Sequence, residues 1–441
     1  MNFRTINQEL FAYIKKSPTS FHAVFQAAEF LKSQGFTPLS EADSWQLLPG
    51  EKYYVIRNHT SIFAFRMPEA SAKHPVHFQI IASHSDSPCF KLKENPEMYV
   101  EKHYTKLNIE RYGGSIFAPW FDRPLSIAGR VTVKDGNKIS SHLIQFKDNL
   151  AMIVNLAIHM NRNVNDSNTY HAQTDMLPLI SCNGTDFSIK QMAAQQLSIK
   201  PEQILSMDLF LYNCMDGTIW GAEDEFISST KLDDLQCAFS SLKALAQDSH
   251  PEVLTAAVIF DNEEVGSQSF QGACSTFLKD CLRRISICMG YTEEEYLRVL
   301  AGSFLLSADN GHAFHPNYGS KADPTNHAYL NQGVLLKFAA NQKYTSDGVT
   351  ASVFQLLCEQ EQIPVQIFFN HSDVPGGSTL GNLSMSQVSI PTVDIGVAML
   401  GMHSPYETGG AKDTLYLYQA MSAFYRTHIH YLGNGSYQLE K

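Results

Sequence analysis

Short polar motifs that close apolar, strand-like runs constrain the fold of this chain more than any other feature of its sequence. The run at residues 253–260 leads into two adjacent glutamates, and the run at residues 304–307 leads into an aspartate. Segments with helical spacing lie between such runs, as at residues 235–246 and 349–359. This alternation predicts an α/β fold with a mostly parallel, helix-covered sheet, and it puts the polar motifs at the carboxyl edge of that sheet.

Five such motifs together supply two histidines and a set of carboxylates. They are His84-Ser85-Asp86, Leu232-Asp233-Asp234, Asp261-Asn262-Glu263-Glu264, Ser307-Ala308-Asp309 and Met402-His403-Ser404. Histidine and carboxylate ligands, with one carboxylate left free beside them, are the side chains that a two-metal hydrolase uses. Each motif by itself also fits a helix cap, a solvated turn or a satisfied core residue. In combination the five predict a metallopeptidase.

The spacing within the motifs indicates how neighbouring side chains divide the chemistry. His84 and Asp86 lie two residues apart and therefore share one face of an extended segment, so Asp86 can hold the imidazole while His84 binds a metal ion. The adjacent side chains of Glu263 and Glu264 point in different directions, so one can bind metal while the other faces the attacking water. Asp233 precedes a predicted helix, where its carboxylate can bridge two cations.

The length and texture of the chain predict two domains. With 441 residues the chain exceeds the size at which one hydrophobic core stops growing. Residues 95–230 change to short β-like segments with glycine-rich turns and little helical periodicity. We therefore expect a discontinuous catalytic domain, residues 1–93 and 232–441, interrupted by a β-rich domain at residues 94–231.

Charge and cysteine usage exclude several classes of partner. The net charge is −11, and no basic stripe is visible, which argues against nucleic acid as a partner. No stretch of eighteen apolar residues occurs, so we expect no membrane span. The eight cysteines form no CxxC pair, which argues against a disulfide framework and a cysteine zinc site. We expect a cytoplasmic protein.

Longer strings of the sequence resemble a known family. They are His84-Ser85-Asp86-Ser87-Pro88, Tyr112-Gly113-Gly114, Trp120-Phe121-Asp122-Arg123, Leu156-Ala157-Ile158-His159, Asp261-Asn262-Glu263-Glu264-Val265-Gly266-Ser267, Ser307-Ala308-Asp309, His315-Pro316-Asn317-Tyr318 and Met402-His403-Ser404. Along essentially its whole length the chain is similar to the aspartyl aminopeptidase family of cocatalytic zinc aminopeptidases. The resemblance implies a zinc-exopeptidase fold with an inserted β-rich dimerisation domain.

The resemblance also implies the ligands of two divalent metal ions. One ion is held by His84, Asp233 and Asp309, and the other by Asp233, Glu264 and His403, with Asp233 bridging. Zinc is the expected ion, and manganese or cobalt are alternatives because the same ligands accept them.

Further roles follow from the resemblance in the same way. Glu263 is expected to be the general base that takes a proton from the water and returns it to the leaving amine. His159, in the inserted domain, is expected to reach the active site of a neighbouring subunit and to stabilise the tetrahedral intermediate. The family assembles as a homo-oligomer, and we expect a dodecamer built from dimers.

The expected substrates are peptides with an acidic N-terminal residue. Lys337 matches a lysine that family members place near the substrate side chain, and Asp373 is a candidate for shaping the substrate-binding loop. The sequence departs from the family pattern at Ala339, where asparagine is common, and at Asp234, where asparagine usually follows the bridging aspartate. Both changes put the side-chain preference in question more than the chemistry.

Three alternatives stay open at the level of sequence. Related enzymes differ in specificity, so the chain is alternatively an aminopeptidase that prefers neutral residues such as leucine. The same ligand order serves carboxypeptidases and deacetylases, which makes an amidohydrolase or deacylase a further alternative. A non-catalytic assembly or receptor-binding protein is the third, although all expected ligands and Glu263 are present.

Overall fold

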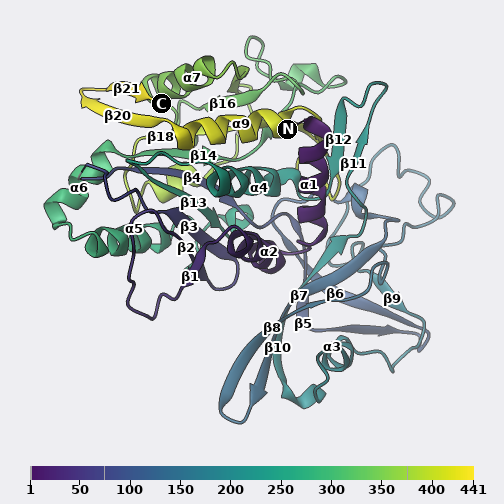
Figure 1. The fold of residues 1–441 in the computed structure, drawn as a ribbon. Helices are drawn as coiled ribbons and strands as arrows, with labels where there is room; N and C mark the ends of the chain where they lie inside the picture. The colour runs from purple at the N-terminus through teal and green to yellow at the C-terminus, as the bar shows by residue number, and fades with distance from the viewer. Residues whose placement is uncertain (1, 74, 375) are drawn as a thin grey trace.

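The protein consists of a large helix-covered sheet and a smaller second sheet that projects from it (Figure 1). The computed structural model describes residues 2–73, 75–374 and 376–441. The large sheet contains 13 strands within the described part of the chain, and the second sheet contains six. The α/β fold predicted from the alternation of apolar runs and helical segments is confirmed.

Four adjacent parallel strands form the centre of the large sheet. In sheet order they are β13 (Leu254–Phe260), β4 (Phe78–His84), β14 (Phe304–Ala308) and β18 (Thr392–Leu400). They are the predicted apolar runs, although β4 begins two residues later than the run that starts at Val76. Because all four run parallel, their carboxyl ends meet at one edge of the sheet.

Shorter strands extend this centre on both sides. They are β1 (Thr37–Leu39), β2 (Lys52–Arg57), β3 (Ser61–Arg66), β11 (Thr218–Trp220), β12 (Phe226–Ser229), β15 (Gly311–His312), β16 (Val334–Phe338), β17 (Val365–Phe369) and β19 (Glu407–Gly410). Several pair antiparallel, for example β3 with β13 and β16 with β18, so the sheet is mixed at its flanks.

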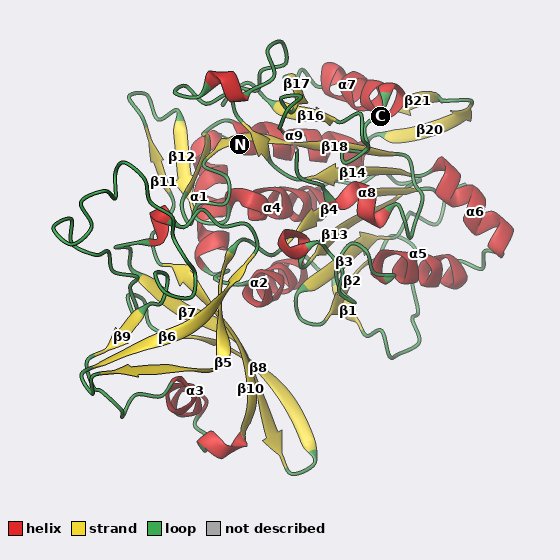
Figure 2. Ribbon diagram, turned by 180° about the vertical axis from the view of Figure 1, so that it is seen from behind, coloured by secondary structure: helices red, strands yellow, loops and turns green. Residues whose placement is uncertain are grey.

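Two hydrophobic cores cover the two faces of the large sheet. Successive strand residues alternate between them: Ile81 and Leu306 belong to one core, while Ile80 and Leu305 belong to the other. The first core is closed by α2 (Ser20–Ser33), α4 (Leu232–Gln247), α7 (Gly348–Gln360) and α9 (Asp413–Arg426). The second is closed by α5 (Phe277–Cys288), α6 (Glu293–Gly302) and α8 (Leu380–Ser384), which face the viewer in Figure 2.

Helix α1 (Phe3–Lys15) lies near α9 and shares a smaller core with the start of α4. Its N-terminal cap is Asn2, whose side chain accepts a hydrogen bond from the backbone N–H of Thr5 at 2.9 Å. The chain ends in a separate hairpin, β20 (His428–Gly433) and β21 (Ser436–Glu440), beside α7.

The second sheet is antiparallel and has its own core. Its strands, in sheet order, are β8 (Lys138–Gln145), β7 (Leu125–Asp135), β10 (Ile204–Asn213), β5 (Cys89–Val100), β6 (Tyr104–Tyr112) and β9 (Leu179–Ser181). Phe90, Trp120 and Ile127 are among the buried side chains, and α3 (Ile189–Leu197) packs against them. This helix lies in a segment where the sequence shows little helical periodicity.

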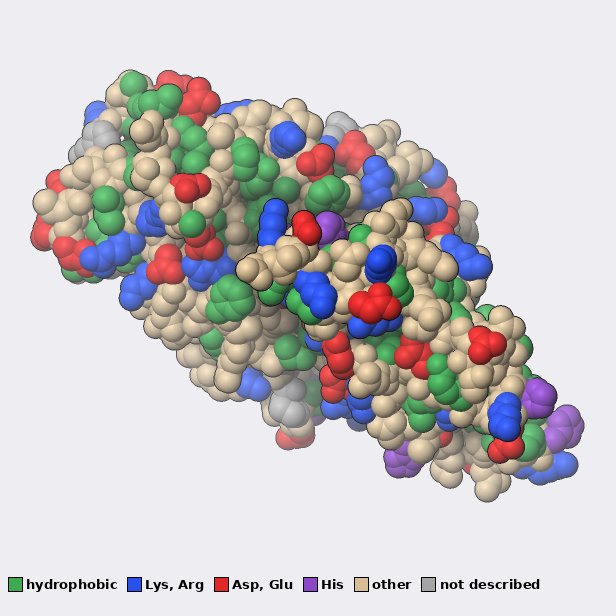
Figure 3. Space-filling model, turned by 90° about the horizontal axis from the view of Figure 1, so that it is seen from below, with side chains coloured by type: hydrophobic (Ala, Val, Ile, Leu, Met, Phe, Trp, Pro, Cys, Tyr) green, Lys and Arg blue, Asp and Glu red, His purple; other side chains and the backbone are tan. Residues whose placement is uncertain are grey.

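Two further features concern possible partners: the charge on the surface and the character of the helices. On the face seen in Figure 3, acidic and basic side chains are interspersed. None of the helices in the described residues combines the length and the apolar character that a membrane crossing requires.

Candidate metal centre

The five predicted ligands meet at the carboxyl edge of the large sheet. His84 is the last residue of β4, and Asp309 follows the end of β14. Glu264 lies in the 3-10 turn Glu263–Val265 after β13, and His403 lies in the turn after β18. Asp233 lies in the first turn of α4 and is joined to Asp234 by a cis peptide bond.

The two carboxylate oxygens of Asp233 face two different histidines. Its Oδ1 lies 3.6 Å from Nε2 of His84, and its Oδ2 lies 3.6 Å from Nε2 of His403. Nε2 of His403 also lies 3.4 Å from Oε2 of Glu264. Asp309 joins the group of His84, Asp233 and Asp234, whose ligand atoms all lie within 4.8 Å of one another.

These distances and the unpaired oxygens fit divalent cations. Any two ligand atoms of a tetrahedral zinc site are separated by about 3.3–3.6 Å when their bonds to the ion are about 2.0–2.2 Å long. Oδ1 of Asp233 and Oε1 of Glu264 are buried and have no hydrogen-bond partner among the described residues. A buried carboxylate oxygen without a donor needs a compensating positive charge. The donor set therefore fits the metal ions that the sequence predicts.

The pKa values of the cluster point the same way. Burial raises the pKa of Glu263 to about 8, with a further rise from the carboxylates of Asp309 and Asp86. Burial likewise raises the pKa of Asp309 to about 6, although the ammonium of Lys337 opposes this rise. The protein alone therefore supplies too little positive charge to hold these two pKa values in their ordinary range, and bound cations would supply it.

Asp86 holds the glutamate pair more directly than it holds the imidazole. Its Oδ1 and Oδ2 accept hydrogen bonds from the backbone N–H groups of Glu263 and Glu264, at 3.1 and 3.2 Å. Nδ1 of His84 lies 3.1 Å from the backbone carbonyl of Asp86 and 3.4 Å from its carboxylate. With Nδ1 directed at these oxygens, Nε2 of His84 is left to face the metal site.

Two carboxylates that the sequence analysis did not assign also shape the centre. Glu407 is buried and accepts the backbone N–H of Asp233 at 3.1 Å and that of His403 at 2.8 Å. Asp234 accepts the backbone N–H of His84 at 3.1 Å and is close enough to the ligand set to join it. Only the place of Asp234 next to Asp233 could have drawn attention to it, and nothing in the sequence distinguishes Glu407.

Lys337, predicted to lie near the substrate, is buried beneath Asp309. Its side chain is 1% exposed, and its ammonium donates hydrogen bonds to the backbone carbonyls of Asp309 and Asn310, at 3.0 and 3.1 Å. The ammonium also lies 3.8 Å from Oδ2 of Asp309 and 4.8 Å from the ring centroid of Tyr344. Burial opposes its charge, but the surrounding carboxylates, Asp309 foremost, hold the pKa of Lys337 above its ordinary range.

Two other predicted residues lie apart from the metal ligands. His159 is exposed, in a turn that follows the segment at residues 151–157. Asp373 is exposed in the loop after β17, where its backbone N–H donates to Nδ1 of His371. Pro375, in the same motif as Asp373, lies outside the described residues.

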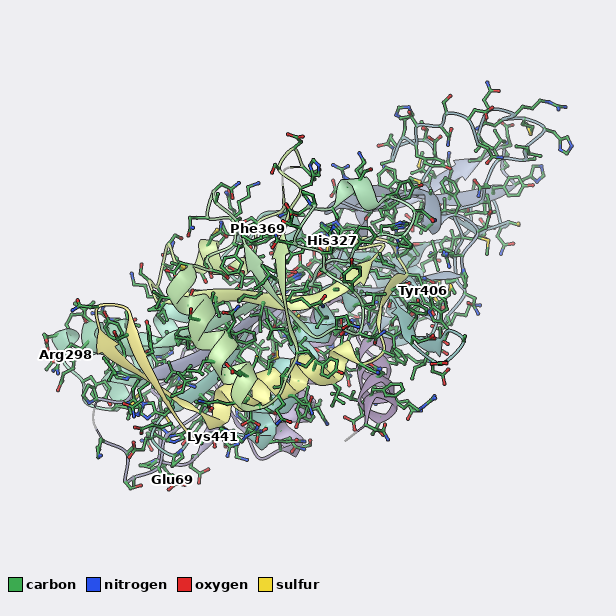
Figure 4. The ribbon with its side chains drawn as sticks, turned by 90° about the horizontal axis from the view of Figure 1, so that it is seen from above. Glu69, Arg298, His327, Phe369, Tyr406 and Lys441 are labelled. Carbon is green, nitrogen blue, oxygen red and sulfur yellow. The ribbon has the colours of Figure 1, made fainter. Side chains whose placement is uncertain are left out.

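A groove and a cavity adjoin the centre on different sides. The groove, of about 290 Å³, runs past His312, Lys321, His371 and Val374 to Gly401, two residues before His403. Figure 4 places Phe369, which lines this groove, on the same side of the molecule as Tyr406 and far from Arg298 at the other end.

The cavity, of about 240 Å³, lies between the two sheets. Its walls include Asp86, Tyr112, Lys231 and Glu407, but none of the five predicted ligands. It therefore lies behind the metal centre, against the residues that hold the ligands in place.

Comparisons with known proteins identify the family. The family model for "Aminopeptidase I zinc metalloprotease (M18)" matches residues 13–425. A probable M18 family aminopeptidase 2 from Clostridium novyi (strain NT) is 43% identical over 423 residues, which cover 95% of this chain and 98% of the relative.

Solved structures agree. A chain in the cryo-EM structure of the Ape4 and Nbr1 complex superposes with a TM-score of 0.91 at 33% identity, covering 96% of this chain and 86% of that chain. The S. cerevisiae mApe1 dodecamer gives a TM-score of 0.82 at 27% identity, covering 96% and 97%. The chain belongs to the aminopeptidase I zinc metalloprotease (M18) family and is a metallo-aminopeptidase.

Proposed function

We propose that this enzyme removes an acidic N-terminal residue, Asp or Glu, from peptides by means of two metal ions and the carboxylate of Glu263. The observation that carries the two-metal proposal is the placement of Asp233, because its two oxygens face His84 and His403 separately. His84 and Asp309 would complete one site with Asp233, and Glu264 and His403 the other. Zinc is the expected ion for this set of nitrogen and oxygen ligands.

Glu263 is the residue that moves the proton. Bound divalent cations would lower the pKa of a water molecule between them and polarise the scissile carbonyl. The backbone N–H of Glu263 is fixed by Asp86. Its carboxylate lies within ligand distance of His84 and Glu264, but in the described structure it belongs to neither of the two groups that contain Asp233, the proposed bridging residue. Its carboxylate is therefore free to accept a proton from the attacking water and to return it to the leaving amine.

Replacement of Glu263 by glutamine tests this role. Because the amide cannot accept the proton, we expect Glu263→Gln to lower kcat by roughly 10²–10⁴-fold. Metal content, measured by elemental analysis, should stay the same. Glu359→Gln, on the exposed face of α7, is the matched control and should keep full activity. Undiminished turnover by Glu263→Gln would rule out the proposed base.

A blocked substrate separates this proposal from a deacylase. An aminopeptidase needs the free α-amino group, so we expect N-acetylated peptides to resist cleavage while the same peptides with free amino termini are hydrolysed. If chromatography instead detects acetate released from an N-acetylated amino acid, the site is assigned to deacylation.

The preference for acidic residues is supported by the positive charge around the groove. Lys321 lines the groove, and Lys337 lies buried beneath Asp309. Burial lowers the pKa of His312, which also lines the groove, so its imidazole is neutral and adds no charge. Cations beside a pocket with low-dielectric walls favour an anionic side chain there. Asp373, two residues after His371 in the sequence, would shape the same substrate loop.

Matched peptides that begin with Asp, Glu or Leu test the preference. We expect kcat/KM to be higher for Asp and Glu than for Leu. In Lys337→Met, we expect the loss for acidic peptides to exceed the loss for Leu by about 10-fold, the equivalent of one charge interaction of roughly 1.5 kcal/mol. If kcat/KM falls equally for all peptides, Lys337 does not contact the substrate and only holds Asp309 and Asn310 in place.

A preference for neutral residues is the second candidate, and the groove also supplies its supporting observation. Phe314, Phe369, Val374 and Met399 give the groove apolar walls that suit a leucine side chain. Higher kcat/KM for Leu than for Asp would select this candidate and leave the two-metal mechanism unchanged.

We further propose that the enzyme is a homo-oligomer whose contacts include the unit at residues 94–231. Five apolar side chains alternate along an exposed segment there: Met152, Val154, Leu156, Ile158 and Met160, which are between 37% and 74% exposed. Such a stripe is typical of a protein interface. The related mApe1 is a dodecamer. In a similar assembly, His159 within this stripe would reach a neighbouring subunit's metal centre.

The cytoplasm is the proposed compartment. All eight cysteines are unpaired thiols, which is the state that a reducing compartment maintains.

A further inference from the structure

The glycine-rich turn at the end of β6 belongs to the second sheet but touches the metal centre. Nδ1 of His403 lies 3.2 Å from the carbonyl oxygen of Gly114. A Cβ on Gly113 would lie 3.1 Å from Cβ of Glu264, and the φ angle of Gly113 is +73°. A Cβ on Gly114 would lie 3.3 Å from Nδ1 of His403. The turn therefore approaches Glu264 and His403 as closely as a backbone without side chains allows.

Tyr112, which precedes these glycines, makes the most specific contact of the turn. Its hydroxyl donates a hydrogen bond of 2.7 Å to Oδ2 of Asp86 and accepts one of 2.9 Å from the side-chain amide of Asn262. The same carboxylate of Asp86 accepts the backbone N–H groups of Glu263 and Glu264. The hydroxyl of Tyr112 thus holds the carboxylate of Asp86, which in turn holds the backbones of Glu263 and Glu264.

We propose that Tyr112 is a positioning residue: its hydroxyl sets the orientation of Asp86 and thereby the placement of Glu263 as base and Glu264 as metal ligand. Without the hydroxyl, the buried carboxylate of Asp86 loses its hydrogen bond from the second sheet and keeps only the two backbone N–H donors whose position it is proposed to set. Because Tyr112 lies on β6, this contact makes the metal centre depend on how the second sheet is docked. The inference rests on the proposed function for the roles of both glutamates, Glu263 as base and Glu264 as metal ligand.

Tyr112→Phe removes only the oxygen, and the chain contains a matched control. Tyr212, on β10 of the same sheet, also lines the cavity between the sheets. Its hydroxyl donates to a carboxylate, that of Asp148 at 3.3 Å, and accepts from an amide, that of Gln145 at 3.0 Å. Tyr212→Phe therefore removes the same kind of contact at a distance from the metal ligands.

The two variants should differ both in metal binding and in kinetics. Zinc is titrated into metal-free protein in competition with a chelator, and kcat and KM are measured on zinc-loaded protein. Loss of a group that orients metal ligands typically lowers metal affinity or activity by about 10–100-fold. For Tyr112→Phe we expect the affinity for one of the two zinc equivalents to fall by about 10–100-fold. We expect kcat to fall by a similar factor and KM to stay unchanged. Tyr212→Phe should have the zinc affinity and kcat of the wild type. A Tyr112→Phe protein with wild-type zinc affinity and kcat would overturn the proposal.

A double-mutant cycle tests the path through Asp86. If Tyr112 acts through this carboxylate, Tyr112→Phe has no further effect on zinc affinity in an Asp86→Asn background, whereas fully additive losses contradict the path. Asn262→Gly preserves the left-handed backbone at φ +62° and removes the amide that orients the phenol, so it should lower zinc affinity in the same direction. The zinc titration needs no substrate, so it tests Tyr112 even if no peptide is cleaved.

Discussion

At the scale of single residues, Glu407 holds two metal ligands through their backbones. Each of its two oxygens accepts one N–H group, from Asp233 and from His403, although these residues are 170 positions apart in the sequence. In the described structure its carboxylate forms no ion pair within 4 Å with the imidazole of His84 or of His403. A carboxylate that accepts backbone donors leaves no spacing pattern in the sequence, because its partners are defined by the fold and not by residue type.

Truncation of this side chain should destabilise the protein even without metal. Glu407→Ala leaves one buried and one partly buried N–H group without an acceptor, and each such group costs about 1–3 kcal/mol. We therefore expect the free energy of unfolding of the chelator-treated protein, measured by urea titration, to fall by about 2–6 kcal/mol. Glu359→Ala on the exposed face of α7 should change it little, and a Glu407→Ala protein as stable as this control would refute the assignment.

The same distinction explains which site residues sequence reasoning can find. His84, Asp233, Glu264, Asp309 and His403 use their side chains toward the metal centre and stand directly after strands or at a helix start, so residue type and position predict them. Tyr112 and Glu407 act on other protein groups and escape prediction. For Lys337 the resemblance predicts a position near the substrate side chain, and this stays a prediction. Its two carbonyl acceptors are visible only in the structure.

At the scale of elements, the central strands follow from their apolar runs, whereas some helices do not. No element is assigned from the sequence at Asp413–Arg426, where α9 is rich in aromatic residues that by propensity also suit strands. Burial decides in favour of the helix, because Leu417, Met421 and Phe424 all pack into the core that closes one face of the sheet.

The terminal hairpin that follows α9 carries a cluster of histidines at its start. The ring of His428, on β20, lies against those of His430, His250 and His77, with ring centroids 3.5, 5.3 and 6.5 Å away. Neither ring nitrogen of His428 has a hydrogen-bond partner among the described residues, although Glu252 lies 3.8 Å from Nδ1 and Glu440 pairs with His430. Burial lowers the pKa of His428 to about 3, and the other histidines add to this effect when charged.

This arrangement should make the hairpin sensitive to acid. The unfolded chain binds a proton at His428 near the ordinary pKa of about 6.5, while the folded chain does so only near 3. Stability is therefore greatest above that ordinary pKa and falls as the pH drops toward 3. We expect His428→Phe to reduce the difference between the urea midpoints measured at about pH 8 and about pH 5. His103→Phe, at an exposed position, should leave that difference as in the wild type, and equal behaviour of both variants would count against the cluster.

At the scale of the whole molecule, the change of texture near residue 95 predicts a β-rich unit, yet the sequence does not indicate how the second sheet meets the large sheet. The contact depends on Gly113 and Gly114, which pack against Glu264 and His403. A Cβ atom added to either glycine would lie only 3.1–3.3 Å from these side chains. Such a fit is a property of two surfaces together. A pattern of turns and alternating residues in either one contains no information about it.

Assembly and activity should be separable at neighbouring positions of the exposed stripe. Ile158→Asp places a charge in the apolar interface that we propose, so we expect it to yield smaller species in analytical ultracentrifugation and to lose activity with them. His159→Ala should keep the assembled mass and lose only kcat. A fully active, monomeric Ile158→Asp protein would exclude a contribution of neighbouring subunits to the site.

The cavity behind the metal centre has a consequence for inhibition. Its walls are the rear surfaces of Asp86, Tyr112 and Glu407, which hold the ligands, and it contains none of the ligands themselves. A small molecule shaped to this space would push these supports out of position without a metal-chelating group. Compounds of that kind would act through residues of both sheets, and so through the docking of the second sheet rather than through the metal ligands.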